Sequence, residues 1–207
     1  MWPSQERPMT GLNNPESRHI TRMETLKAIK TASKGKRRTD LIGLVSEAIT
    51  HDDIFGTINY RNKSEDEIKQ FIYPHLVDRL IEREMGLKPH WSKDKAKAEI
   101  KKRLKWEGNV NTTVHHMLFM GTQNRPDMVL ETDGLRIAIE FKRGDKGSDL
   151  RSGIGQSMIY ATGYDFVIYM FVDTSADKRI KNAQTGEIEA TFIQMLWDRY
   201  NIKFAVA

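Results

Sequence analysis

The chain contains no cysteine among its 207 residues. This absence excludes disulfide bonds, thiol nucleophiles, zinc ribbons and iron–sulfur ligation by its own side chains, and it is typical of a reducing, cytoplasmic compartment. No apolar run approaches the about 20 residues that cross a bilayer, so no membrane partner is expected. The first residues, Met1 to Pro8, also lack the basic-then-apolar order of a signal peptide.

The composition is that of a soluble globular protein, and its basic residues are unevenly distributed. Apolar residues make up 39% of the chain, enough for a sizeable core. From Lys88 to Lys105 there are eight Lys or Arg residues against two acids. Such a segment attracts phosphate backbones, but a solvated helix face has the same composition. Nucleic acid is therefore one reading of this segment, and a charged surface is the other.

Three segments of different character are expected along the chain. Residues 1–20 hold three of the six prolines and are predicted to be a flexible arm. Residues 21–60 are predicted to be an N-terminal helical extension, with Asp40 as the N-cap of one of its helices. Residues 61–207 are expected to form the main domain.

The first long helix of the main domain is predicted over residues 64–85. Ser64 and Glu67 have the spacing of a capping box, and apolar residues then follow the helical period. Pro74 is expected to kink or split this helix, and Gly86 to end it. A second, strongly basic helix is predicted over residues 92–106.

After these helices the hydrophobic period changes to that of strands. Helices are expected at 152–162 and 187–200, after a polar loop at 143–151. Strands are expected at 114–120, 126–130, 135–142, 166–172 and 202–206, with a hairpin turn at 131–134. The order of elements predicts an α/β fold, in which a mixed central β-sheet is flanked by helices.

The two strands of this hairpin carry the most informative side chains. Asp127 stands near the start of the first strand, while Glu140 and Lys142 are two residues apart on the second and therefore share a face. Two carboxylates and an ammonium group suit a site that holds Mg²⁺ and activates water. The alternative is a surface ion pair between Glu140 and Lys142, which contributes little and leaves Asp127 unexplained.

These residues resemble the motif of the PD-(D/E)xK nuclease superfamily, the fold of many restriction endonucleases. Pro126-Asp127 is similar to its first half and Glu140-Phe141-Lys142 to its second. Gln156 and Tyr160 resemble the Q-xxx-Y helix of the branch that includes the RecB and lambda-exonuclease nuclease domains. The resemblance covers about residues 64–172 and implies a restriction endonuclease-like core with the order αβββαβ.

The resemblance implies a nuclease that hydrolyses phosphodiester bonds in DNA, with Mg²⁺ as cofactor and Mn²⁺ as a substitute. Asp127, Glu140, the backbone carbonyl of Phe141 and Glu65 would hold the metal. Lys142 would assist the attacking water, and Gln156 and Tyr160 would complete the site.

Several alternatives stay open at this level. Glu65 could instead serve the dipole of its helix, and Gln156 and Tyr160 could simply pack against the sheet. The chain could bind nucleic acid without cleaving it, or it could be an effector nuclease of defence or mobile-element biology. A homodimer, or a larger complex formed through the N-terminal region, is compatible with cutting both strands. The predicted nucleic-acid contacts are Arg143, Lys146, Arg151, Lys101, Lys102 and Arg103.

Overall fold

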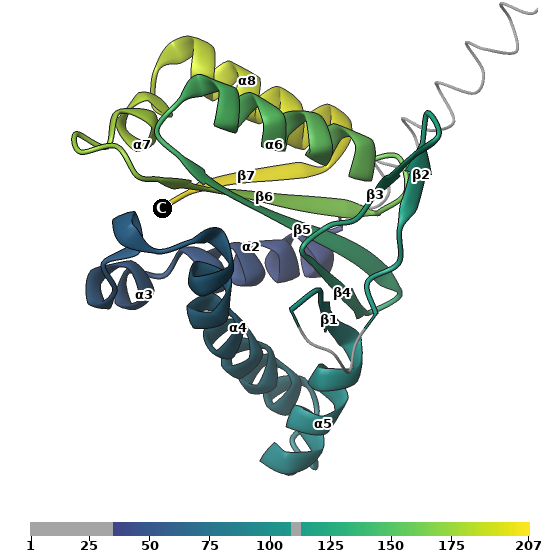
Figure 1. Cartoon of the computed structure of the whole chain (residues 1–207). Helices are drawn as coiled ribbons and strands as arrows, with labels where there is room; N and C mark the ends of the chain where they lie inside the picture. Colours follow the sequence, from purple (N-terminus) through teal and green to yellow (C-terminus); the bar gives the residue numbers. More distant parts are fainter. Residues whose placement is uncertain (1–34, 109–112) are drawn as a thin grey trace, which may run out of the picture.

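The computed structural model describes residues 35–108 and 113–207, and these form a mixed five-stranded sheet between two layers of helices (Figure 1). The sheet order is β1-β4-β5-β6-β7. The β1–β4 and β4–β5 pairs are antiparallel, and the β5–β6 and β6–β7 pairs are parallel. The α/β class and the mixed sheet predicted from the sequence are therefore confirmed. The strands are β1 Leu104–Trp106, β4 Met128–Thr132, β5 Leu135–Gly144, β6 Phe166–Asp173 and β7 Ile202–Val206.

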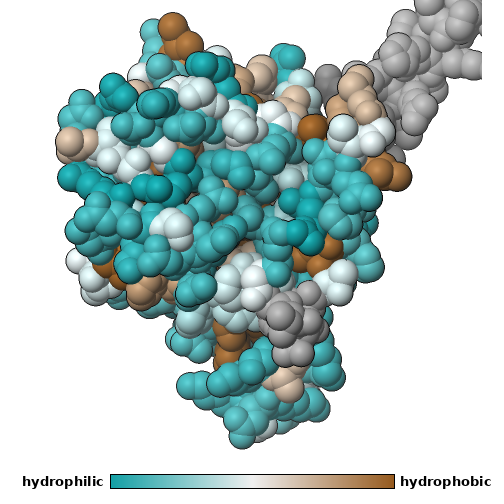
Figure 2. Space-filling view, viewed as in Figure 1, coloured by the Kyte–Doolittle hydropathy of each residue, from teal (hydrophilic) through white to brown (hydrophobic). Residues whose placement is uncertain are grey.

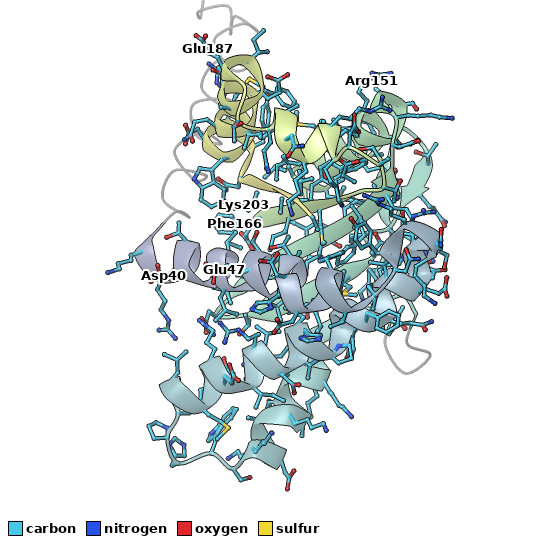
Figure 3. All side chains as sticks on the ribbon, turned by 90° about the vertical axis from the view of Figure 1, so that its left-hand side faces the viewer. Asp40, Glu47, Arg151, Phe166, Glu187 and Lys203 are labelled. Atoms are coloured by element: carbon cyan, nitrogen blue, oxygen red, sulfur yellow. The ribbon has the colours of Figure 1, made fainter. Side chains whose placement is uncertain are left out.

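One face of the sheet is covered by α2 and α4, and the other by α6 and α8 (Figures 1 and 3). In Figure 3, Phe166 and Lys203 on the sheet lie between α2, which carries Asp40 and Glu47, and α8, which begins at Glu187. The helices are α2 Lys36–Thr50, α3 Asp52–Thr57, α4 Glu65–Leu87, α5 Lys93–Arg103, α6 Gly147–Tyr160, α7 Arg179–Ala183 and α8 Glu187–Tyr200, with a 3-10 turn, η1, at Tyr60–Asn62.

Side-chain alternation along the strands supplies a separate core for each face. On β5, Ile139 and Phe141 pack with α2 and α4, whereas Ala138 packs toward α6 and α8. Every residue of β6 is buried, as the near-continuous apolar run over 166–172 predicts for a strand covered on both faces. The predicted helix at 187–200 and strand at 202–206 are also confirmed.

Helix α4 differs from its prediction in the effect of Pro74. The capping box of Ser64 and Glu67 is present, but Pro74 lies inside one helix that runs on through Gly86 to Leu87. Pro74 is on the exposed side, while Ile72 and Leu76 beside it are fully buried. Because this packing holds both halves of the helix against the core, the hydrogen bond that proline cannot make does not split it.

The described part of the predicted N-terminal extension shares the main core. Leu41, Val45 and Ile49 of α2 are fully buried against α4 and the sheet. Asp40 is not an N-cap, because α2 begins four residues earlier and its N-cap is Gly35. Residues 1–34, with the predicted arm at 1–20, lie outside the described residues.

The predicted first strand of the sheet is wrong. Residues 117–119 form β2 (Met117–Phe119), which pairs with β3 (Thr122–Asn124) in a separate two-stranded ribbon. Met120 and Gly121 between them both have positive φ and turn the chain back at once. The edge of the main sheet is instead β1, which was predicted as the end of the basic helix. That helix, α5, stops at Arg103.

The hairpin turn and the start of α6 complete the comparison. Thr132 pairs with Leu135, and Asp133 and Gly134 between them both have positive φ, so the predicted hairpin is confirmed as a two-residue turn. The segment 143–151, predicted as a loop, instead contains the end of β5 and the first turn of α6. This longer helix brings Gly153 against the ring of Tyr169 on β6.

Two glycines of α6 provide a matched test of this packing. A Cβ at Gly153 would overlap the Tyr169 ring, whereas one at Gly155 meets nothing within 4 Å. We expect Gly153→Ala to destabilise the protein by about 1–3 kcal/mol, because the core must repack. Gly155→Ala should stabilise it by about 0.5–1 kcal/mol, because alanine is the better helix former. Urea denaturation measures both, and equal effects would show that α6 does not sit this close to β6.

Candidate active site

Asp127, Glu140 and Lys142 lie together where β4 begins and β5 approaches its end. Met128 pairs with Ile139, so Asp127, one residue earlier, stands opposite Glu140 on the neighbouring strand. Opposed residues of an antiparallel pair point to the same face of the sheet. The hairpin therefore delivers the two carboxylates to one side, and Lys142 follows on that side of β5. These are the residues that the sequence singled out.

The carboxylate of Asp127 is buried and held by two donors. Its Oδ2 accepts a hydrogen bond of 2.8 Å from the backbone N–H of Phe141, and its Oδ1 lies 2.7 Å from Nζ of Lys69. Only 7% of Asp127 is exposed. In a strand the N–H and C=O of one residue point to the same side, so the Phe141 carbonyl also faces the Asp127 side of β5.

The first two turns of α4 bring a further acid and a further lysine to this place. Nζ of Lys69 lies 2.8 Å from Oδ1 of Asp66 and 3.7 Å from Oε1 of Glu65. Nζ of Lys142 lies 3.0 Å from Oε1 of Glu140 and 3.8 Å from that same Glu65 oxygen. Acids and lysines thus alternate through the site. We call these six residues the acid–lysine network: Glu65, Asp66, Lys69, Asp127, Glu140 and Lys142.

Charge in the acid–lysine network is unbalanced. Four carboxylates face two ammonium groups, so with all six ionised the network carries −2. Burial raises the pKa of Glu140 to about 7, and repulsion from Asp127 acts in the same direction while Lys142 opposes it. Burial likewise raises the pKa of Glu65. Two acids of one cluster therefore resist ionisation, which is the situation that an added cation relieves.

The donor set of the network fits a divalent cation. Mg²⁺ and Mn²⁺ prefer oxygen ligands, and each oxygen of an ionised carboxylate has two lone pairs, so the present partners of Asp127 do not exhaust it. Within residues 35–108 and 113–207, however, no three His, Asp or Glu side chains stand as a ready-made metal site. The two lysine ammonium groups instead contact the carboxylates, with Lys69 between Asp127 and Glu65 and Lys142 between Glu140 and Glu65.

Tyr160 and Gln156 come from α6, which covers the opposite face of the sheet from α4. The Tyr160 hydroxyl donates a hydrogen bond of 2.8 Å to the carbonyl of Arg125, two residues before Asp127. Its pKa is raised by burial and by the nearby charges of Glu140 and Asp127. Gln156 has a buried Oε1 that finds no hydrogen-bond partner among the described residues. Tyr160 thus fixes the segment that leads into Asp127.

Lys69 and Asp66 are the residues of the network that the sequence reasoning missed, and Lys69 is the buried one. Its signal is its position four residues after Glu65 and three before Ile72, which puts it on the inward face of α4. A lysine on a buried helix face needs a partner. Two of its three partners, Glu65 and Asp127, are acids identified from the sequence, so the position of Lys69 completes the network.

The predicted nucleic-acid contacts fall on two separate parts of the molecule. Arg103 and Lys102 of α5 pair with Glu99, and Arg103 also lies 3.5 Å from Thr132 Oγ1, at the end of β4 away from Asp127. The five residues of β4, Met128–Thr132, separate Thr132 from Asp127 and span about 17 Å. Lys101, their exposed neighbour, is on the same helix. The structure therefore does not bring the α5 cations to the acid–lysine network.

The other predicted cations lie at the end of β5 and at the start of α6. Arg143 is half-buried and donates to the carbonyl of Arg61 at 2.9 Å, which ties β5 to η1. Lys146 is the exposed N-cap of α6, and Arg151 is exposed on its second turn. The adjacent Leu150 carbonyl accepts a hydrogen bond from Tyr169, the strand neighbour of Glu140. Figure 3 shows Arg151 on the α6 side of the sheet, opposite α4.

The surface is predominantly hydrophilic on the face shown in Figure 2, where hydrophobic side chains occur in small separate patches. No helix of the described ranges is long and apolar enough to cross a membrane. Comparison with models of protein families, with curated proteins and with solved structures finds no match to this chain. The acid–lysine network is therefore the feature of this protein that indicates a function.

The pKa of Glu140 predicts a pH-dependent stability. Between pH 4.5, its ordinary pKa, and about 7, the folded protein retains a proton that the unfolded chain has released. The free energy of unfolding from this group therefore falls as pH rises through that window and is constant above it. Glu140→Gln lacks this decline and should be more stable than wild type at pH 8 by on the order of 2–3 kcal/mol. Urea denaturation at pH 5, 6, 7 and 8 measures the difference. Parallel curves would show that Glu140 is not protonated in this way.

Proposed function

We propose that this protein is a divalent-metal-dependent nuclease with a restriction endonuclease-like core, and that it hydrolyses phosphodiester bonds in DNA. One observation carries the proposal: Asp127 just before β4, Glu140 and Lys142 of β5, and Glu65 of α4 meet in one half-buried network of charges. The order α4, β1, β4, β5, α6, β6 supports it, since it is compatible with the αβββαβ order of that core.

The metal would be held by oxygen ligands from both strands of the hairpin. Asp127 and Glu140 are the principal ligands, Glu65 is a third carboxylate, and the carbonyl of Phe141 faces the same side of β5. A bound Mg²⁺ or Mn²⁺ supplies a Lewis acid that polarises the phosphate and activates water. With all six groups ionised, the network carries −2, which is opposite in sign and equal in size to the charge of such an ion.

Lys142 is placed to act on the reacting groups. Its side chain is 22% exposed, whereas that of Glu140 is 2% exposed, so the ammonium group lies between the buried acid and solvent. An ammonium there can orient a water molecule and offset the negative charge that develops on phosphate in the transition state. Glu140 keeps the ammonium group in place at 3.0 Å.

The substrate would approach on the α6 side of the sheet. The exposed Lys146 and Arg151 stand at the start of α6, the helix whose Leu150 carbonyl accepts a hydrogen bond from Tyr169, the strand neighbour of Glu140. Cations beside a reaction centre can hold the phosphate backbone across it. The cytoplasmic location, and a partner bound through the N-terminal region, stay predictions from the sequence.

Cleavage assays test the role of Lys142. Plasmid DNA, linear duplex DNA, single-stranded DNA and RNA are each tested separately with Mg²⁺. On the substrate that is cleaved, we expect Lys142→Met to reduce kcat by about 10²–10³-fold, because it removes a charge aimed at the transition state. Lys105→Met is the matched control, since Lys105 is also a strand lysine paired with a glutamate, at 2.8 Å from Glu131. It should retain activity within about twofold. Binding without turnover in Mg²⁺ and in Mn²⁺ would identify a non-catalytic binding module instead.

The salt dependence of DNA binding tests which cations contact the substrate. Each phosphate contact adds about 0.9 to the slope of log affinity against log salt concentration. The double variant Lys146→Ala, Arg151→Ala should therefore lower that slope by about 2. The double variant Lys101→Ala, Lys102→Ala removes the same charge from α5 and should lower it by less than about 0.5. The reverse ranking would place the bound DNA along α5.

A further inference from the structure

Lys69 is buried among carboxylates. Its side chain is only 6% exposed, and Nζ contacts Asp127 at 2.7 Å, Asp66 at 2.8 Å and Glu65 at 3.7 Å. Burial alone would lower the pKa of this lysine, but Asp127 and the other two acids raise it above its ordinary value, so the side chain is a cation. Lys142, by comparison, is 22% exposed. Of the two lysines, Lys69 is therefore the one turned away from solvent.

The partners of Lys69 include two of the proposed metal ligands. Oδ1 of Asp127 is its closest contact, and the other oxygen of that carboxylate already accepts the N–H of Phe141. A divalent ion bound by Asp127 would share this carboxylate with the ammonium group, and the two cations repel each other at such separations. Asp66, the third partner, has a side chain that is largely exposed at the outer side of α4.

We propose that Lys69 is a built-in counter-cation that competes with the divalent ion for Asp127. This competition sets the affinity of the site for the metal, and the proposal rests on the metal site of the proposed function. Without metal, Lys69 neutralises the buried acids and holds α4 against the start of β4. With metal, its ammonium group is retained by Asp66, which is not a proposed ligand, while Asp127 turns its charge to the ion. The site then releases its metal more readily than carboxylates alone would.

A purely structural ion pair makes the opposite prediction. If Lys69 served only to position Asp127, its removal would scatter the ligands and weaken metal binding. If Lys69 competes with the metal, its removal deletes a repelling charge beside a doubly charged ion. The apparent dissociation constant for Mn²⁺ should then fall by about tenfold or more. The direction of the change separates the two roles.

Mn²⁺ binding to the full chain, without nucleic acid, tests the proposal. Calorimetric titration and thermal melting, in EDTA and in increasing Mn²⁺, are compared for wild type, Lys69→Met and Lys69→Gln. The glutamine variant keeps a hydrogen-bond donor for Asp127 but no charge. Lys63→Met is the matched control, because Lys63 is a lysine near the same end of α4 that pairs with Glu67 at 2.9 Å, outside the network. Asp127→Asn shows whether the measured ion binds at this site.

We expect both Lys69 variants to melt at a lower temperature than wild type in EDTA, because buried acids lose their partner. In Mn²⁺ they should recover, with half-saturation at about one tenth of the wild-type concentration. Unchanged or weaker Mn²⁺ binding by both variants, or failure of Mn²⁺ to restore folding, overturns the role of Lys69 and leaves the nuclease proposal standing. Absence of Mn²⁺ binding by wild type as well overturns the metal site and with it the proposed function.

Discussion

The carboxylate of Asp127 is tied to two parts of the fold at once. One oxygen accepts the backbone N–H of Phe141 and so closes the hairpin at the point where the ladder between β4 and β5 ends. The other oxygen contacts the ammonium group of Lys69 on α4. A helix that packs on one face of the sheet is thereby joined to a residue whose side chain points to the opposite face. A buried charge with a single partner is costly to keep. The double attachment is what allows an acid to be 7% exposed at the edge of the core.

The same place is approached from the opposite layer by α6. The Tyr160 hydroxyl holds the Arg125 carbonyl, and the Tyr169 hydroxyl holds that of Leu150, so strand, helix and connecting segment are fastened around Glu140. Neither hydrogen bond involves a group that is proposed to react. Together they fix the backbone on both sides of the carboxylates, and a site that must position groups within a fraction of an ångström needs such support.

The sequence predicted the parts of this protein that follow from local rules. The capping box at Ser64, the buried strand β6 and the turn at Asp133-Gly134 each depend on a few neighbouring residues, and each was found. The juxtaposition of Asp127 and Glu140 was also predictable, since a two-residue turn fixes the register of its hairpin. The split predicted at Pro74 does not occur, because the packing of α4 against the core outweighs one lost hydrogen bond.

The failures share a physical cause, which is tertiary contact. Leu104 to Trp106 has no strand signal of its own, and only its pairing with β4 makes it an edge strand. Met117 to Phe119 has the better pattern, but its nearest partner lies just across a tight turn. Lys69 in isolation is an ordinary helix lysine. Its significance depends on Asp127, fifty-eight positions later in the chain, and no short-range pattern contains that pairing.

The separate β2–β3 ribbon has a consequence for how this architecture can vary. It is inserted between β1 and β4, which already pair directly with each other, so the sheet closes without it. Met117 of the ribbon packs against the core on the α6 side. Beyond it, lengthening or shortening the ribbon changes a loop whose ends are held in place, and the entropy of such a loop depends weakly on its length. Leu118 and Met120, both well exposed on the ribbon, can therefore diverge freely between descendants of this chain while the register that brings Asp127 to Glu140 is preserved.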